Sequence, residues 1–353
     1  MRSAATVLGL AAFVSPCLAP AGTVAWRAVL DQPAAWYASA EARALVDNVL
    51  LYQHPAGGWP KNRDMTLPPS AQPATKETAD PTIDNGATTT QLRLLARVVS
   101  AQPAPAARTA FERGFDYLLA AQYDTGGWPQ FFPLHEGYAR HITYNDNAMV
   151  NVLEVLRDAA HGREPFAFVD AGRRARAAAA VEQGIACILR TQVRQDGRLT
   201  AWCAQHDEQT LAPAPARKFE PASLSGGETV GIVRFLMSVP QPSPEIVAAI
   251  EGAVAWFRQV QLHGVRETHP PNPALPHKFD RVLLPDPSAP PLWARFYELG
   301  TNRPIYTGRD AVVRYDLAQV EPERRGGYAW HVTDPQKLLE RDYPRWKEKN
   351  QLP

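Results

Sequence analysis

The chain has 353 residues, of which 45% are hydrophobic and 21% are charged. These proportions are typical of a soluble globular protein and exclude a disordered, collagenous or membrane-spanning chain. The 37 Lys and Arg residues nearly balance the 36 Asp and Glu residues, so no strong positive field attracts nucleic acid or an anionic membrane.

The first residues have the three parts of a secretory signal peptide. A positively charged start precedes an apolar run from Ala4 to Val14 and the small residues Ala19-Pro20-Ala21. This pattern predicts a signal peptide over residues 1–21 and a secreted protein, extracellular or periplasmic. An amphipathic first helix is the alternative. We expect residues 22–353 to form a single domain that acts as a monomer.

Four amphipathic helices recur along the chain with a nearly constant spacing. Each has apolar residues at i, i+3, i+4 and i+7 and is followed by a glutamine. The glutamines are separated by 69, 70 and 69 residues. Two of these helices continue into the same Gly-Gly-Trp-Pro sequence, at 57–60 and 126–129, where glycine ends a helix and proline prevents its continuation. The four glutamines that mark this internal repeat are Gln53, Gln122, Gln192 and Gln261.

A second helix is expected in three of the repeats. Short polar or small residues precede apolar-periodic runs at Asp84-Asn85-Gly86, Asp146-Asn147 and Ser225-Gly226-Gly227-Glu228. Such residues are favoured where helices begin. No stretch of the chain has a comparable pattern that predicts strands.

Helix pairs that cannot bury their apolar faces alone stack on their neighbours. We therefore predict an all-α fold, an α/α toroid built from helical-hairpin repeats of about 70 residues. In such a ring the inner helices begin at one rim, and the loops before them form a cleft. The long loops that would line this cleft are 60–81, 134–143, 200–224 and 264–291.

Two Asp-Asn pairs, Asp84-Asn85 and Asp146-Asn147, stand at equivalent places in two repeats. One interpretation is helix N-capping, which needs no function. The other is that carboxylate and amide oxygens converge on a cation, and oxygen ligands are preferred by Ca²⁺. No EF-hand loop and no zinc-binding histidine spacing occurs, so we expect His206-Asp207 to be surface residues.

Basic residues gather in three loop segments, at Arg217-Lys218, at Arg303 with Arg309, and at Arg324-Arg325. Guanidinium groups bind carboxylates in a bidentate way. Arginines that face a calcium pocket therefore favour a substrate that carries many carboxylates.

Four other side chains leave alternatives open. Trp59 and Trp128 of the Gly-Gly-Trp-Pro sequences either stack on sugar rings or pack between repeats. Cys187 and Cys203 either form a disulfide or remain buried thiols.

Several stretches of the chain, in the same order, resemble family 10 polysaccharide lyases, the pectate lyases. The similarity runs from about residue 45 to about residue 331. The stretches are Gly57-Gly58-Trp59-Pro60-Lys61-Asn62, Thr82-Ile83-Asp84-Asn85-Gly86-Ala87-Thr88, Gly126-Gly127-Trp128-Pro129-Gln130, Ile142-Thr143-Tyr144-Asn145-Asp146-Asn147-Ala148-Met149, Trp202-Cys203-Ala204-Gln205-His206-Asp207 and Arg295-Phe296-Tyr297-Glu298-Leu299-Gly300-Thr301-Asn302-Arg303-Pro304.

The resemblance implies a secreted α/α toroidal enzyme that cleaves α-1,4-linked polygalacturonate by anti β-elimination with Ca²⁺. It implies Asp146 and Asn85 as metal ligands and places Asp84 beside both the metal and the substrate carboxylate. It also implies Arg217 as the base that removes the C5 proton, although its neighbour Lys218 is an alternative for this role. The candidate substrate-binding residues are Arg303, Asp84, Lys218 and Trp128.

Three other classes of protein are alternatives to a pectate lyase. A toroid-fold glycoside hydrolase needs two carboxylates as acid and base. A non-catalytic protein that binds acidic polysaccharide needs aromatic platforms and no base. A triterpene cyclase shares Q-x3-G-x-W, present at 53–59 and 122–128, but needs a D-x-D-D cluster that this chain lacks.

Overall fold

The computed structural model describes residues 24–73, 75 and 78–352. The signal peptide predicted over residues 1–21 lies outside these residues, and the secreted location stays a prediction. Within the described ranges, no helix combines the length and the apolar character needed to cross a membrane.

The long helices form two rows, and each helix packs against its neighbours in its own row and against a helix of the other row. The helices that pack most closely are joined by the short loops 102–104, 161–170 and 238–243, and not by the long loops that the sequence predicted for the hairpins. The first row is α1 (Ala40–Leu51), α3 (Pro105–Ala120), α5 (Ala171–Thr191) and α7 (Pro244–Gln259). The second row is α2 (Thr89–Ala101), α4 (Ala148–Ala160) and α6 (Glu228–Met237).

Three of the four repeated glutamines connect one repeat to the next. The side-chain amide of each donates to a carbonyl in its own loop and to a second carbonyl in the following first-row helix. Among the described residues Gln261 makes no such pair of bonds, and no further first-row helix follows it. The glutamines and their acceptors in the next helix are Gln53 with Ala110 at 2.8 Å, Gln122 with Ala180 at 2.9 Å and Gln192 with Ala249 at 2.8 Å.

A tryptophan packs at the same place in each of the four repeats. Every one of these rings is fully buried, and its Nε1 donates at 2.8 Å to a carbonyl near the end of a first-row helix. The packing alternative is therefore confirmed, and the prediction that Trp128 binds substrate is wrong because no sugar can reach its ring. The tryptophans and their acceptors are Trp59 with Val49, Trp128 with Leu118, Trp202 with Ile188, and Trp293 with Phe257.

The predicted all-α toroid is wrong, because short strands occur in the loops from Ile142 onward. Most strands have two residues, too few to produce a recognisable alternation of polar and apolar side chains. β1 (Ile142–Thr143), β4 (Gln205–His206) and β5 (Pro213–Ala214) form a three-stranded sheet in the order β1-β4-β5. The two-stranded sheets pair β2 (Arg194–Gln195) with β3 (Arg198–Leu199), β6 (Leu224–Ser225) with β10 (Phe296–Tyr297), β7 (Val265–Thr268) with β8 (Val282–Pro285), β9 (Trp293–Ala294) with β13 (His331–Val332), and β11 (Tyr306–Thr307) with β12 (Val313–Arg314).

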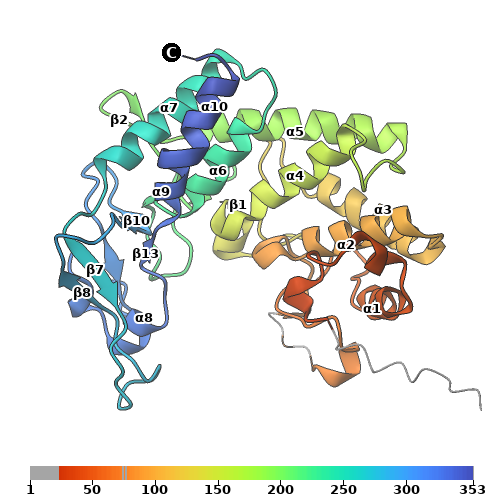
Figure 1. Cartoon of the computed structure of the whole chain (residues 1–353), viewed down its shortest axis with the longest axis horizontal. Coiled ribbons are helices and arrows are strands. Elements are labelled where there is room, and N and C mark those ends of the chain that lie inside the picture. The colour runs from red at the N-terminus through yellow and green to blue at the C-terminus, as the bar shows by residue number, and fades with distance from the viewer. Residues whose placement is uncertain (1–23, 74, 76–77, 353) are drawn as a thin grey trace, which may run out of the picture.

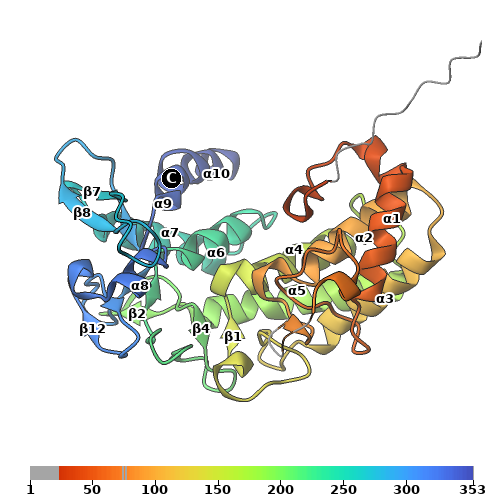
Figure 2. The same cartoon turned by 90° about the horizontal axis from the view of Figure 1, so that it is seen from below.

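The helical rows follow an open arch (Figure 1). Residues 265–332 lie at the end of the arch far from α1. We call them the strand segment, because they contain β7–β13 together with the short helix α8 (Pro322–Gly326). Figure 2 shows from below that the strand segment and α1 lie at opposite ends of the molecule. The chain then returns to the rows through α9 (Asp334–Lys337), a π-helical turn at Leu338–Asp342 that contacts α6, and α10 (Tyr343–Lys349).

One hydrophobic core follows both helical rows, and a smaller cluster fills the strand segment. Whether the chain is one domain and a monomer stays a prediction. The smaller cluster consists of Phe296, Ile305, Tyr306, Leu317, Val320 and Trp330.

His206 is buried in β4, so the expectation that it lies on the surface is wrong. Its Nε2 accepts from the Cys203 N–H at 3.1 Å, and its Nδ1 lies 2.9 Å from the Leu211 carbonyl oxygen. Burial lowers the pKa of His206 to about 4, so the ring is a neutral structural group. Cys187 and Cys203 are both buried and free, which excludes the disulfide alternative.

Candidate active site

Two short turns that precede α2 and α4 place polar side chains side by side. Asp84–Gly86 and Asn145–Asn147 each form a 3-10 turn, and the two turns contact one another. Asn85 has φ 51° and ψ 33°, and Asp146 has φ 51° and ψ 32°. Asn85 therefore matches Asp146, and Asp84 matches Asn145, a one-residue shift from the alignment of the two Asp-Asn pairs. Asn and Asp adopt this left-handed conformation more readily than most residues.

These side chains do not cap the helices that follow them. The residues just before α2 and α4 accept no hydrogen bond from their own helix through a side chain. By contrast, Ser39, Asp170 and Ser243 accept such bonds at the starts of α1, α5 and α7. The capping interpretation is therefore wrong for the two turns, because their carboxylate and amide groups take no part in starting the helices.

The Asp84 carboxylate is buried, and both repeats contribute to its surroundings. Its Oδ2 accepts from Lys61 Nζ at 2.6 Å and from Gln130 Nε2 at 2.7 Å. Lys61 and Gln130 are the residues that follow the two Gly-Gly-Trp-Pro sequences, so the repeat directs both to one oxygen. Among the described residues Asp84 Oδ1 has no hydrogen-bond partner. A buried carboxylate oxygen without a partner is unfavourable, which makes Asp84 a good ligand for a cation.

Asp146 lies in a second polar network that reaches into the strand segment. Arg295 Nη2 is 3.2 Å from Asn145 Oδ1, 3.5 Å from Asp146 Oδ1 and 2.9 Å from Glu228 Oε1. Partial burial raises the pKa of Asp146, with further increases from the Glu228 and Asp84 carboxylates, while Arg295 lowers it. A bound cation would offset the repulsion between neighbouring carboxylates.

Arg217 faces these oxygen groups from the loop between β5 and β6. Its Nε donates to Glu220 Oε2 at 2.8 Å and its Nη2 donates to Glu220 Oε1 at 2.5 Å. This bidentate ion pair raises the pKa of Arg217, although burial acts in the opposite direction. The Arg217 side chain is 48% exposed, so a ligand in the cavity can reach it.

A cavity of about 310 Å³ brings these groups together. A neighbouring cavity of about 380 Å³ shares Lys61, Tyr138 and Arg217 with it and extends the cleft beyond the arginine. The residues that line the first cavity are Lys61, Asn62, Asp84, Asn85, Gln130, Tyr138, Asn145, Asp146, Gln205, Ala216, Arg217 and Glu220.

Two predicted substrate-binding residues lie elsewhere in the described structure. Lys218 is exposed and does not line either cavity. The Arg303 guanidinium lies 3.6 Å from the centre of the Tyr315 ring and is also absent from both linings. Their roles in substrate binding stay predictions.

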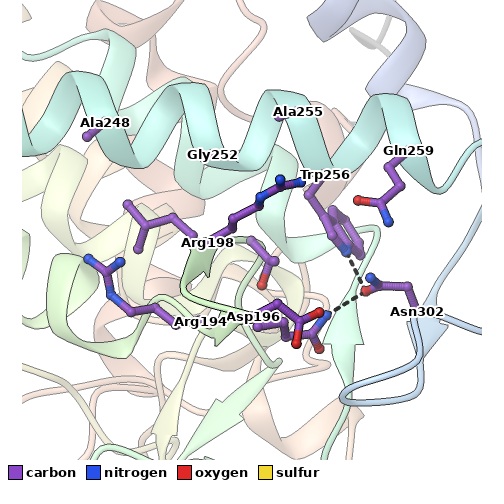
Figure 3. Close-up of a pocket in the computed structure, with 12 residues that line it drawn as sticks. Arg194, Asp196, Arg198, Ala248, Gly252, Ala255, Trp256, Gln259 and Asn302 are labelled. Carbon is purple, nitrogen blue, oxygen red and sulfur yellow. Dashed lines mark hydrogen bonds between the residues drawn. The ribbon is translucent and has the colours of Figure 1, made fainter.

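A larger cavity, of about 630 Å³, lies between α7 and the β2–β3 turn (Figure 3). Asp196 is the one carboxylate among the residues that line it, and Arg194 and Arg198 stand in the same cavity. The Asn302 side chain accepts from Trp256 Nε1 and from Gln195 Nε2, both at 2.9 Å. One carboxylate beside two arginines does not make a cation site.

A cluster of His141, Asp207 and Glu208 has potential ligand atoms within 4.8 Å of one another. However, Glu208 forms an ion pair with Arg140 at 2.5 Å, and Asp207 Oδ1 accepts from the backbone and the hydroxyl of Thr210. Oxygens of both acidic groups thus have partners, whereas among the described residues Asp84 Oδ1 has none, so the cavity with Asp84 and Asp146 offers the freer ligand for a cation.

Several residues of the site were not identified from the sequence. Lys61 and Gln130 had a detectable signal, their shared place after Gly-Gly-Trp-Pro. Glu220 and Glu228 had none, because an isolated glutamate in a loop or at a helix start is ordinary. Arg295 reaches the site only because β10 pairs with β6, and strands this short are not predicted.

The carboxylates and amides on one wall and the arginine on the other make a cleft suited to an acidic polymer. Residues 53–339 match the family described as pectic acid lyase. No curated protein matches the chain. A solved family 10 polysaccharide lyase from Cellvibrio cellulosa is 35% identical, with a TM-score of 0.76 over 92% of this chain and 95% of that one.

A second solved structure is an Asp-to-Ala variant of the Cellvibrio cellulosa lyase in complex with trigalacturonic acid. It is 36% identical, with a TM-score of 0.75 over 91% of this chain and 98% of that one. The chain therefore belongs to the pectic acid lyase family and is a pectate-degrading lyase.

Proposed function

We propose that the enzyme cleaves α-1,4-linked polygalacturonate by anti β-elimination, with Ca²⁺ bound in the cavity and Arg217 as the base. The observation that carries this proposal is the meeting of Asp84, Asn85 and Asp146 with Arg217 in one cavity of about 310 Å³. The trigalacturonic acid held by the 36% identical lyase supports a galacturonate substrate.

The residues that would hold Ca²⁺ are Asp146, Asn85 and Asp84. Their donor atoms are all oxygens, and Asp84 Oδ1, which has no hydrogen-bond partner among the described residues, can coordinate a cation. Three side chains leave further positions of the usual six to eight for water and substrate oxygens. When bound, the ion draws electron density from the substrate carboxylate and makes the adjacent C5 proton more acidic.

Other side chains orient the proposed metal ligands. Lys61 and Gln130 hold the Asp84 carboxylate from two sides, which fixes its orientation. Arg295 does the same for Asn145 and Asp146. Positive groups held in advance around a developing negative charge stabilise the transition state without further reorganisation.

Arg217 would remove the proton on C5 with an unprotonated guanidinium nitrogen. The C5–H electron pair then forms the C4–C5 double bond, and the C4–O4 bond breaks on the opposite face. The departing O4 takes a proton from solvent. An arginine is normally charged, so this role requires positive neighbours and burial to disfavour the charge once substrate is bound.

The test is to incubate the described enzyme with polygalacturonate and follow the ultraviolet absorbance of the unsaturated product. The proposal predicts an increase with Ca²⁺, none with a chelator, and recovery when excess Ca²⁺ is added. A glycoside hydrolase would instead produce reducing ends without absorbance, and a binding protein would produce neither. Either of those results would exclude β-elimination.

A further inference from the structure

The Glu220 carboxylate lies between two arginines. Its Oε1 accepts from Arg217 Nη2 at 2.5 Å, and Nη2 of Arg324 lies 3.8 Å from the same oxygen. Arg324 comes from α8 in the strand segment, and Arg217 comes from the loop after β5. One carboxylate oxygen is thus bonded to one guanidinium and almost within reach of another.

Arg324 is buried, and within the described ranges its guanidinium group lacks hydrogen-bond acceptors at normal distance. Its side chain is 4% exposed, and among the described residues its Nε and Nη2 have no hydrogen-bond partner. Aromatic rings surround it, with ring centres at 3.7 Å for Tyr328, 4.8 Å for Phe219 and 5.1 Å for Trp330. Cation–π contacts stabilise the charge only in part, and burial lowers the pKa of Arg324. Glu220 is the carboxylate that stands within 4.0 Å to satisfy it.

The present arrangement opposes the role proposed for Arg217. The ion pair with Glu220 raises the pKa of Arg217, whereas a base must give up its proton. If Glu220 moved to Arg324, Arg217 would lose its stabilising partner. Arg309, which pairs with Glu323, would remain nearby, since its guanidinium lies 4.7 Å from the same Phe219 ring that Arg217 approaches to 5.0 Å. Positive neighbours disfavour a protonated guanidinium.

We propose that Arg324 is a positioning residue that takes the Glu220 carboxylate from Arg217 when substrate enters the cleft, and so releases Arg217 to act as the base. This inference rests on the function proposed for Arg217. The exchange needs only side-chain movement, because closing 3.8 Å to the usual charge-assisted distance of about 2.8 Å is a shift of about 1 Å. Arg217 already lines the cavity and is half exposed, so it can turn toward the substrate.

The test compares Arg324→Gln, Glu220→Gln and the double variant in steady-state kinetics on polygalacturonate with Ca²⁺. In Arg324→Gln, Glu220 stays on Arg217, so we expect kcat to fall about tenfold with KM within about twofold. The acid side of the kcat profile moves to higher pH because the paired arginine is harder to deprotonate. The Glu220 charge affects the pKa of four groups, which are Arg217, Arg324, Arg295 and Tyr328.

The double variant gives the decisive result. Removing Glu220 from the Arg324→Gln enzyme should restore kcat by about fivefold, because no carboxylate remains to hold Arg217. No recovery, or a further loss, would mean that Arg324 only supports the fold. A higher KM at unchanged kcat would mean that Arg324 binds substrate instead. Either outcome overturns the proposal.

Arg281→Gln is the matched control for structural damage. Arg281 is likewise a poorly exposed arginine of the strand segment with an unpartnered Nε, but it pairs with Glu267. Glu220→Gln should not rescue any loss that this variant causes. If Arg324→Gln does not fold, Glu220→Gln alone remains informative. It should move the acid side of the kcat/KM profile to lower pH and leave the kcat profile in place, and equal movement of both contradicts the exchange.

These outcomes separate the two proposals. A wild-type enzyme that forms no unsaturated product removes the function proposed for Arg217. An active wild-type enzyme whose double variant shows no rescue removes only the exchange of Glu220.

Discussion

The oxygen-rich half of the cleft comes from the helical repeats, whereas the positive half is Arg217, on the loop between β5 and β6. The strand segment does not line the two cavities of the cleft but contacts the residues that do. The repeats supply Asp84, Asn85, Asn145 and Asp146 from two turns of matched geometry, so the oxygen-rich wall is a product of the repeat itself. The strand segment has no repeat, and it supplies the positive groups Arg295 and Arg324 that surround this wall and Glu220. A regular scaffold can duplicate a ligand turn, whereas a base and its controlling groups need single, unrepeated positions.

The largest expected effect concerns the positive half. Arg217→Ala should lower kcat by about a thousandfold while the far-ultraviolet circular dichroism stays unchanged, because general-base catalysis contributes factors of this order. Lys218→Ala should cause a much smaller loss. If Lys218→Ala has the greater effect, the base is Lys218 and the assignment of Arg217 is wrong.

The next effect concerns the oxygen-rich half. Asp146→Ala removes a proposed ligand, and we expect Ca²⁺ affinity measured by calorimetry to fall by about a hundredfold, with activity restored in part by high Ca²⁺. Asp207→Ala changes the alternative cluster of His141, Asp207 and Glu208. A larger loss of Ca²⁺ affinity in Asp207→Ala would move the metal to that cluster.

A smaller effect tests a buried group of the three-stranded sheet beside the cleft. The pKa of His206 is lowered from 6.5 to about 4 by burial, so only the unfolded chain takes up a proton between these values. Stability from this source is complete above pH 6.5, is lost as the pH falls toward 4, and amounts to about 3 kcal/mol in total. Urea unfolding of wild type and His206→Gln across this range measures it; parallel curves for the two proteins would contradict it.

The smallest effect tests the repeat itself. Gln192→Ala removes the side-chain donor to the buried carbonyls of Thr200 and Ala249, of which only Ala249 also has a helical donor, and this should lower the free energy of unfolding by about 2 kcal/mol. Gln261→Ala, at the same place in the last repeat, should change it by less than about 0.5 kcal/mol. Equal losses in thermal or urea unfolding would show that the glutamine bonds do not connect the repeats.

The parts of the fold that could be predicted are those encoded by the internal sequence repeat. The 69- and 70-residue steps between glutamines follow from bonds that three of them make to the next first-row helix, so the positions of the long helices were predicted correctly. The closed ring and the absence of strands were wrong, because two-residue strands leave no pattern and an arch has the same local repeats as a toroid. The burial of Trp128 and His206 also depends on contacts between repeats that no local pattern contains.

The candidate site residues that could be grouped from the sequence are mainly those at repeated positions. Asp84, Asn85 and Asp146 line one cavity with Arg217, as expected, although the two turns match in a register shifted by one residue. Arg303 and Lys218 could not be placed from the sequence, because side chains on unrepeated loops are oriented by tertiary contacts such as the Arg303 stack on Tyr315. Glu220 and Arg324 become visible as a pair only when α8 is packed against the loop after β5.

Calorimetry on the Arg217→Ala variant tests most directly whether both halves of the cleft meet on one sugar carboxylate. Ca²⁺ is titrated into this variant with and without saturating trigalacturonate, which the missing base leaves uncleaved. If one carboxylate bridges the metal and the protein, trigalacturonate should tighten Ca²⁺ binding by about tenfold or more, and Ca²⁺ should tighten trigalacturonate binding by the same factor. Ca²⁺ affinities that are equal with and without the sugar would contradict the account.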